Sequence, residues 1–197
     1  LRHQGSVAEY HLGRARGRRR AELPQHVSRR RALLIPEEYD ESFQPVIGAP
    51  VTIRPLRPDD SAIERDFVTG LSDESRYNRL LGGAIKVSDE YIRRLTELDW
   101  SREAAFAAVT MIGDRESIIG VARYVVEEDG EDCEFALVLA DAWQGRGIGR
   151  HMLEKLMSVA AQRGVRRMHG DILSSNTPML GLVRKLGFRL KRHPQDA

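Results

Sequence analysis

The sequence contains a single cysteine, Cys133, and its uninterrupted apolar runs, such as Phe135–Ala140, are short. One thiol excludes an internal disulfide and a metal site built from several cysteines. Runs of this length are far too short to cross a bilayer, and the basic N-terminal stretch lacks the apolar core of a secretory signal. We therefore expect a cytoplasmic chain with no membrane partner and no metal site.

Charge is unevenly distributed along the chain. The formal net charge is only +2, yet residues 1–35 carry nine arginines against Glu9 and Glu22. A basic tail on a mildly acidic body is compatible with nucleic acid or an acidic protein surface as a partner. The tail offers only Tyr10 as an aromatic platform for stacked bases. We expect residues 1–45 to form a flexible, solvated extension that does not bind nucleic acid, followed by one domain over residues 46–192.

Hydrophobic periodicity and turn residues outline a domain of mixed strands and helices. The hydrophobic fraction of 41% is sufficient for a packed core. Strands are predicted at 51–53, 104–111, 117–126, 133–139 and 165–173. Helices are predicted from the cap at 59–61 through 68, from Ser88 through Leu98, over 147–162 and over 178–186. This order predicts an α/β layer fold with a central sheet.

The most informative stretch runs from Gln144 to Arg150, where a strand ends, a glycine-rich turn follows and an amphipathic helix begins. The glycines let the backbone approach a ligand where a Cβ would intrude. The first amides of the helix lack intrahelical acceptors and carry the positive end of the helix dipole, and two arginines add charge. The pattern predicts a pyrophosphate site, although a tight turn alone would also explain three glycines. A P-loop is excluded because no Lys-Ser/Thr pair follows, and the late position of the glycines argues against a dinucleotide fingerprint.

Two linked motifs identify a family resemblance. The pattern Gln144-x-x-Gly147-x-Gly149 resembles the pyrophosphate-binding signature of the GNAT superfamily of N-acetyltransferases, and the stretch from Asn176 through Phe188 resembles its second signature. The resemblance spans roughly residues 51–190 and implies a mixed, largely antiparallel sheet flanked by helices, with acetyl-CoA as cosubstrate.

Within the superfamily, the chain is most similar to bacterial protein lysine acetyltransferases that modify acyl-CoA synthetases. Three stretches carry this likeness, at residues 53–60, 71–79 and 95–103. The resemblance therefore implies a protein lysine as the acceptor. A small-molecule amine is an alternative acceptor, and a non-catalytic acyl-CoA sensor with a nucleic-acid-binding tail is an alternative function.

The resemblance also implies which residues bind acetyl-CoA. The pantetheine arm would pair with the backbone of the strand that precedes the glycine turn, much like an added strand. The expected cosubstrate-binding residues are Leu137, Val138, Leu139, Gln144, Gly145, Arg146, Gly147, Ile148, Gly149, Arg150 and Asn176. Asn176 precedes Thr177 and Pro178, so it is also expected to cap the last helix.

Glu134 is the expected general base. Strand alternation places it on the face opposite Cys133, among apolar neighbours, so we expect partial desolvation that would suit proton transfer near neutral pH. The resemblance implies the same role, because Glu134 matches the position of the base in the lysine acetyltransferases; a strand-end acid paired with an arginine is the alternative. Many relatives carry a tyrosine as general acid where this chain has Val183, so no acid is assigned. Cys133 is interpreted as a core residue, and His169 is kept as a reserve base.

Overall fold

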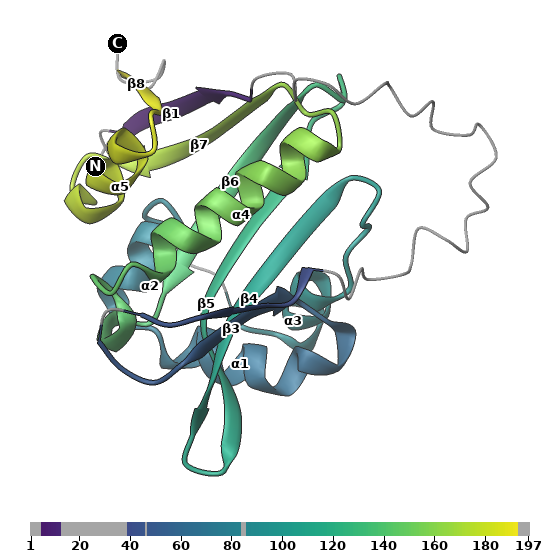
Figure 1. Ribbon diagram of the computed structural model, residues 1–197, viewed down its shortest axis with the longest axis vertical. Coiled ribbons are helices and arrows are strands. Elements are labelled where there is room, and N and C mark those ends of the chain that lie inside the picture. Colours follow the sequence, from purple (N-terminus) through teal and green to yellow (C-terminus); the bar gives the residue numbers. More distant parts are fainter. Residues whose placement is uncertain (1–4, 13–38, 46, 84–85, 193–197) are drawn as a thin grey trace, which may run out of the picture.

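The computed structural model describes residues 5–12, 39–45, 47–83 and 86–192, and it is built around one eight-stranded sheet (Figure 1). The strand order is β2-β3-β4-β5-β6-β7-β1-β8, and every neighbouring pair is antiparallel except β6 and β7. The strands are β1 (Gly5–His11), β2 (Glu41–Phe43), β3 (Val51–Pro55), β4 (Glu103–Ile112), β5 (Arg115–Val126), β6 (Asp132–Leu139), β7 (Arg167–Leu173) and β8 (Arg189–Arg192). The expected mixed, largely antiparallel sheet is confirmed.

The helices begin where the sequence supplies capping groups. Ser72 and Ser88 each accept a hydrogen bond from the backbone amide three residues on, which satisfies an otherwise unpaired donor at the start of a helix. The α-helices are α1 (Ser61–Gly70), α2 (Asp73–Arg79), α3 (Asp89–Thr96), α4 (Ile148–Gln162) and α5 (Thr177–Lys185), and the short 3-10 helices are η2 (Pro58–Asp60) and η3 (Asp141–Trp143). The segment that forms α2 was not predicted as a helix.

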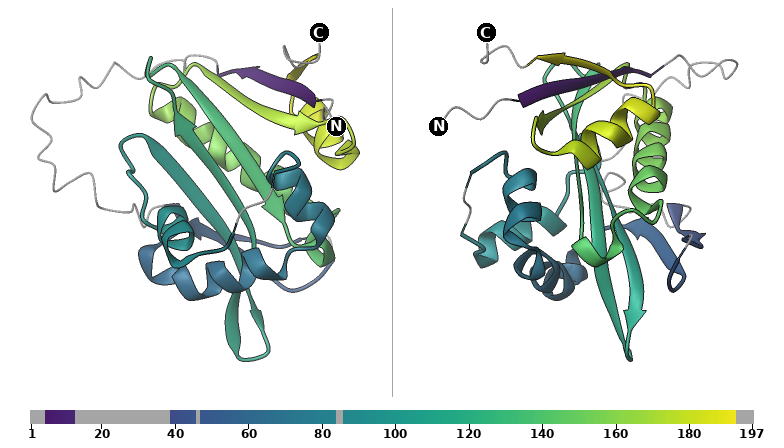
Figure 2. Two further views of the ribbon diagram at one scale, coloured as in Figure 1. Left: turned by 180° about the vertical axis from the view of Figure 1, so that it is seen from behind. Right: turned by 90° about the vertical axis from the view of Figure 1, so that its left-hand side faces the viewer.

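The helices cover the two faces of the sheet separately. Seen edge-on, α1, α2 and α3 lie on one side of the sheet and α4 lies on the other (Figure 2). The central strand β4 is buried on both faces from Ala104 to Thr110, which explains its continuous run of small and apolar residues. Among the described residues, no helix combines the length and the apolar character needed to span a membrane.

The N-terminal segment corrects the expected domain boundary. Residues 1–45 are predicted to be a flexible extension, but β1 lies between β7 and β8 and pairs antiparallel with both. Its central residue, Ala8, is fully buried, and β2 adds a further strand beside β3. The prediction is wrong for these strands. The neighbouring arginines dominate the charge of this segment and so favoured a solvated tail, although seven residues are enough to form a strand. The remainder of the predicted extension, residues 13–38, lies outside the described residues.

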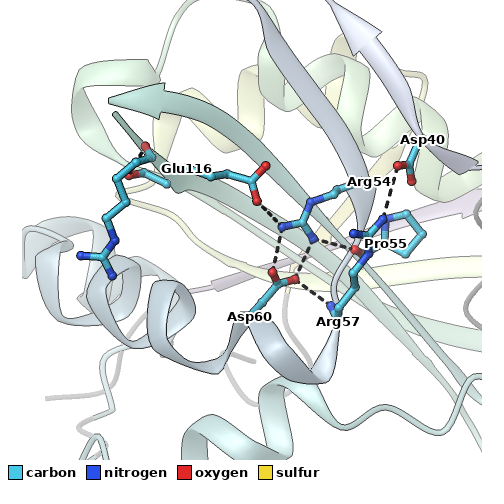
Figure 3. Close-up of polar contacts among 8 residues, drawn as sticks. Asp40, Arg54, Pro55, Arg57, Asp60 and Glu116 are labelled. Carbon is cyan, nitrogen blue, oxygen red and sulfur yellow. Dashed lines mark hydrogen bonds and ion pairs between the residues drawn. The ribbon is translucent and has the colours of Figure 1, made fainter. Parts of the chain in front are cut away.

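The stretch 53–60, which carries part of the family likeness, forms a buried ionic anchor (Figure 3). Arg54 is 5% exposed and makes two bonds to Asp60, at 2.7 and 2.8 Å, and a third to Glu116 at 2.7 Å. Burial alone would lower the pKa of Arg54, but these hydrogen bonds outweigh it and the pKa is raised. The anchor ties β3 to the start of α1 and to β5, so this motif supports the fold and lies apart from the glycine turn.

Candidate active site

The parallel strands β6 and β7 separate after a short region of pairing. They pair only over Asp132–Glu134 and Arg167–His169, although β6 continues to Leu139 and β7 to Leu173. Phe135 fills the base of this fork, since a Cβ at Gly170 would lie 2.7 Å from its ring. Beyond it, one backbone edge of β6 has no neighbouring strand among the described residues. An unpaired strand edge can accept an extended ligand through main-chain hydrogen bonds.

The short helix η3 follows this open edge, and the glycine turn then leads from η3 into α4. Gly145 and Gly147 have φ values of +72° and +87°, a left-handed conformation that strains any residue with a Cβ. Gly149 serves a different purpose, because a Cβ there would lie 3.1 Å from Leu139 Cδ1 and would push α4 away from β6. The first amide of α4 that finds a main-chain acceptor within the described chain is that of His151, which bonds to Gly147 at 3.1 Å. The preceding amides therefore have no main-chain acceptor there, which is the arrangement that allows a helix N-terminus to bind an anion.

The two arginines of the turn are held by their neighbours. The Arg146 guanidinium stacks over Trp143 at 4.9 Å and donates to the carbonyl of Ile47 at 3.3 Å. Arg150 pairs with Glu154, one turn along α4, at 2.9 Å. Both side chains lie near the glycine turn, so they add positive charge around its backbone amides. Directional hydrogen bonds to an anion would come from the amides themselves.

Gln144 links the glycine turn to the opposite helical layer. Its Nε2 donates to the Leu139 carbonyl and to Ser75 Oγ, both at 3.1 Å. Ser75 and Ser72 in turn donate to Asp141 Oδ1, at 2.8 and 3.0 Å, and the bond from Ser75 is the main reason why the pKa of Asp141 is lowered. Sequence reasoning missed this network because its halves lie about 70 residues apart. The Ser-x-x-Ser spacing at the start of α2 was the available signal.

Glu134 is exposed, so the partial desolvation expected for it is absent. Its cross-strand partners are Val125, which is itself 45% exposed, and His169. His169 contacts Glu127 at 2.7 Å through its Nε2. The side chain of Glu134 makes no hydrogen bond or ion pair within the described part of the chain, and the alternative of an arginine pair is not seen there. Glu134 is thus a carboxylate open to solvent at the base of the fork.

Three further residues lie where the sequence predicted them. The Asn176 side chain accepts from the Met179 amide at 3.2 Å, which confirms its capping role. Cys133 is fully buried on the opposite face from Glu134, and burial raises the pKa of its thiol to about 12, so its thiolate is suppressed. Val183 is also fully buried, and its side chain has no hydroxyl group that could act as the general acid.

A cavity on the α1–α3 side of the sheet was not predicted. It lies between these helices and the strands β5 and β6, and Val138 belongs to its wall. Glu64 of α1 lines it and is only 2% exposed. The spacing of Glu64, Phe67 and Leu71, which places all three on one helical face, was the signal that could have revealed the buried acid.

Comparison with known proteins agrees with this geometry. The model of the acetyltransferase (GNAT) domain family matches residues 51–189. An acetyltransferase of Pseudomonas aeruginosa is 33% identical over 150 residues, covering 76% of this chain and 81% of that protein. The acetyltransferase Pat of Mycolicibacterium smegmatis is 29% identical over 136 residues, covering 68% of this chain but only 40% of Pat. The crystal structure of the GNAT domain of S. lividans PAT superposes with a TM-score of 0.72 and 28% identity, covering 81% of this chain and 93% of that one.

The fork, the glycine turn and the family match point to the same kind of cosubstrate. The open edge of β6 is followed along the chain by the first amides of α4, an arrangement that would suit a long ligand with a phosphate group. The chain belongs to the GNAT acetyltransferase family and is an acetyl-CoA-dependent acyltransferase.

Proposed function

We propose that this chain transfers the acetyl group of acetyl-CoA to the side-chain amine of a protein lysine. The observation that carries the proposal is the continuity between the open edge of β6 and the N-terminus of α4. The amides of Gly145–Arg150 hold the pyrophosphate, and the backbone of Leu137–Leu139 pairs with the pantetheine arm. Asn176 contributes a further polar contact to the arm while it caps α5. Acetyl-CoA supplies an activated thioester, which lies toward the base of the fork.

Glu134 is the proposed proton acceptor of the reaction. A lysine amine with a pKa of about 10.4 is mostly protonated at neutral pH, so a base is needed. The acceptor nitrogen forms a bond to the thioester carbonyl carbon as the carbon–sulfur bond breaks. Its proton passes to Glu134 through water, since this carboxylate is open to solvent. The departing thiolate takes a proton from solvent, because Val183 offers none.

The exposure of Glu134 favours a protein acceptor over a small amine. A small amine would be expected in a closed, acid-lined pocket, whereas a lysine on a protein surface needs an open approach. The resemblance of residues 53–60, 71–79 and 95–103 to protein lysine acetyltransferases supports the same choice. Transfer to a small amine, and acyl-CoA binding without turnover, are the competing outcomes of the test.

The cosubstrate site is tested with Gly147→Glu. The substitution places a Cβ and a negative charge at the proposed phosphate position, so calorimetry should show that acetyl-CoA binding is lost. The matched control is Gly113→Glu, because Gly113 has φ +63° with open space around it and lies in the turn between β4 and β5. The control carries similar backbone strain and charge and should bind normally. Equal binding by both variants would contradict the assignment of the glycine turn.

The acceptor is tested by incubating a cell lysate with the chain and isotope-labelled acetyl-CoA. Mass spectrometry of the digested proteins should find label on lysine side chains, and the same lysate with the Gly147→Glu variant should show none above background. Label confined to small amines would contradict the lysine acceptor. Binding without any transfer of label would support the sensor function instead.

A further inference from the structure

The cavity beneath α1, α2 and α3 has a mostly apolar wall with a few polar groups, as small-molecule sites usually have. Its volume is about 40 Å³, which is room for about three water molecules and so for a short acyl tail rather than a large ligand. Here the charged groups in the wall are Glu64 from α1, Arg76 and Arg79 from α2, and Arg123 from β5.

Two unsatisfied polar atoms lie in this wall. Within the described residues, only Glu64 Oε2 and Arg76 Nε are buried side-chain nitrogen or oxygen atoms without a hydrogen-bond partner. Both residues line the cavity. Buried polar groups are nearly always paired, so two unpaired groups in one cavity point to a ligand that completes them. That ligand must accept a hydrogen bond from Arg76 Nε and must also pair with the Glu64 carboxyl.

The charge of the wall favours an anion. Three arginines and one glutamate line the wall; Arg76 also pairs with Asp73 at 3.6 Å, and no Glu64–arginine ion pair forms within the described chain. Burial raises the pKa of Glu64 to about 7; Arg123 and Arg79 oppose the rise, and Asp60 of η2 adds to it. Tyr91 of α3 completes the polar surroundings. A protonated Glu64 can donate a hydrogen bond to an anion, so a carboxylate would satisfy both unpaired groups.

The position of the cavity indicates which ligand carboxylate would bind in it. Val138, in its wall, belongs to the β6 segment proposed to hold the pantetheine arm, and Arg123 lies directly across from Ala136 on the neighbouring strand. An acyl chain that leaves the thioester toward the α1–α3 face would therefore enter this cavity. We infer that the cavity is an acyl pocket that recognises a carboxylate at the far end of the chain, as in CoA monothioesters of short dicarboxylic acids. This inference rests on the proposed function.

The transfer step is the same as for acetyl. The amide carbon–nitrogen bond forms, the thioester carbon–sulfur bond breaks, the proton of the amine leaves through water to Glu134, and solvent protonates the thiolate. The distal carboxylate keeps its charge throughout and takes no part in bond exchange. Because the acyl tail is held beneath α1–α3, the acceptor amine can still approach from the solvent side of the fork, where Glu134 is exposed.

The test compares two thioesters that differ only at the end of the chain. Calorimetry on the full chain measures the Kd of succinyl-CoA and of butyryl-CoA, in which a methyl group replaces the terminal carboxylate. We expect succinyl-CoA to bind about tenfold more tightly at pH 6, as is typical of one charge-assisted hydrogen-bonded contact. The preference should narrow at pH 8, where Glu64 is mostly ionised and repels the carboxylate.

Two variants should change this preference in opposite directions. Arg79→Met removes a cavity charge and should abolish most of the preference at pH 6, whereas the matched control Arg94→Met removes an exposed charge of α3 and should keep it. Glu64→Gln removes the ionisable group and retains an N–H donor, so it should keep the full preference at pH 8. A purely structural disturbance would weaken the binding of both thioesters in both variants. Circular dichroism confirms that each variant is folded.

Two results would overturn the inference. If acetyl-CoA binds in a Gly147-dependent manner but succinyl-CoA binds no better than butyryl-CoA, the acyl pocket is wrong and the proposed function stands. A second arm measures acetyl transfer to β-alanine and to propylamine. If β-alanine is strongly preferred over propylamine and no thioester is preferred, the cavity binds a carboxylate of the acceptor and not one of the acyl chain. If no thioester binds at all, the proposed function itself fails.

Discussion

Two glutamates on the same side of the sheet have opposite environments. Glu134 stands on a central strand yet is open to solvent, and its cross-strand neighbour Val125 is 45% exposed. Glu64 stands on a helix yet is 2% exposed, because α1 turns this side of its surface toward β5. The first suits an exchange of protons with water, and the second suits a group that must sense a ligand in a low-dielectric cavity.

Glu134→Gln tests the proposed base. The substitution keeps the shape of the side chain and removes its ability to take a proton, so turnover on a lysine acceptor should fall by about 10²–10⁴-fold at neutral pH. Acetyl-CoA affinity from calorimetry should barely change. At high pH, where more of the amine is already neutral, the variant should partly recover. Glu128→Gln, on the exposed loop beside β6, serves as the control. If the Glu134 variant has the same turnover as this control, another group must be the base, and His169 is the next residue to test.

Glu64→Gln tests the buried carboxyl through protein stability. The pKa of Glu64 is about 7 in the folded chain against 4.5 as its ordinary value. The folded state therefore holds a proton that the unfolded state releases, and the stabilisation present below pH 4.5 is lost as pH rises to about 7. Relative to Glu64→Gln, the wild type should lose on the order of 2–3 kcal/mol of unfolding free energy between pH 5 and pH 8. Urea denaturation measures it, and the exposed Glu90→Gln should show no such trend.

At the scale of elements, the three stretches that carry the likeness to lysine acetyltransferases each join distant parts of the fold. Arg54 ties β3 to η2 and β5. Ser72 and Ser75 at the start of α2 hold Asp141 and Gln144 beside the glycine turn. Trp100, before β4, packs beneath the Arg163 guanidinium at 5.4 Å, where α4 ends. The α2 network reaches the proposed cosubstrate site.

Ser75→Ala tests this connection. The substitution removes one hydrogen bond to Asp141 and leaves Gln144 Nε2 with only the Leu139 carbonyl. A hydrogen bond is worth about 1 kcal/mol, so acetyl-CoA affinity should fall about fivefold if the network positions the turn. Ser101→Ala removes a comparable Ser–Asp hydrogen bond, to Asp99, away from the turn. Calorimetry should show a loss for the first variant and none for the second; equal affinities would mean that the network only supports the fold.

At the scale of the whole molecule, the sheet joins the two ends of the described chain. β1 is inserted between β7 and β8, so strands from the beginning and the end of the sequence lie side by side (Figure 1). Glu9 of β1 pairs with Lys191 of β8 at 2.7 Å, and Tyr10 packs against Phe188 with ring centroids 5.2 Å apart. β7 and β8, which both pair with β1, therefore depend on it for support.

Deletion of residues 1–12 should consequently destabilise the chain. Loss of only three backbone hydrogen bonds, at about 1 kcal/mol each, would lower the Tm by about 6–12 °C in a protein of this size. Deletion of residues 1–4, which stops before β1, is the matched control and should leave the Tm nearly unchanged. Differential scanning calorimetry measures both. If the truncated chain has the same Tm as the full-length protein, β1 contributes nothing to stability.

Local patterns in the sequence determined much of this protein. The positions of β3 to β7, the helix α4 and the cap of α5 follow from periodicity and capping residues that lie within a few positions of one another. The positive φ values of Gly145 and Gly147 also agree with the predicted turn. These features were predictable because neighbouring residues decide them.

Only the tertiary structure decided the features that depend on distant segments. Gly5–His11 reads as part of a basic tail until β7 and β8 supply its partners. Glu134 looks desolvated by its apolar sequence neighbours, but the elements that pack on the sheet leave it exposed at this end of β6. Glu64 looks like an ordinary helix acid until α2, α3 and β5 enclose it. Strand pairing and desolvation depend on which elements meet in space, and a one-dimensional pattern carries that information only weakly.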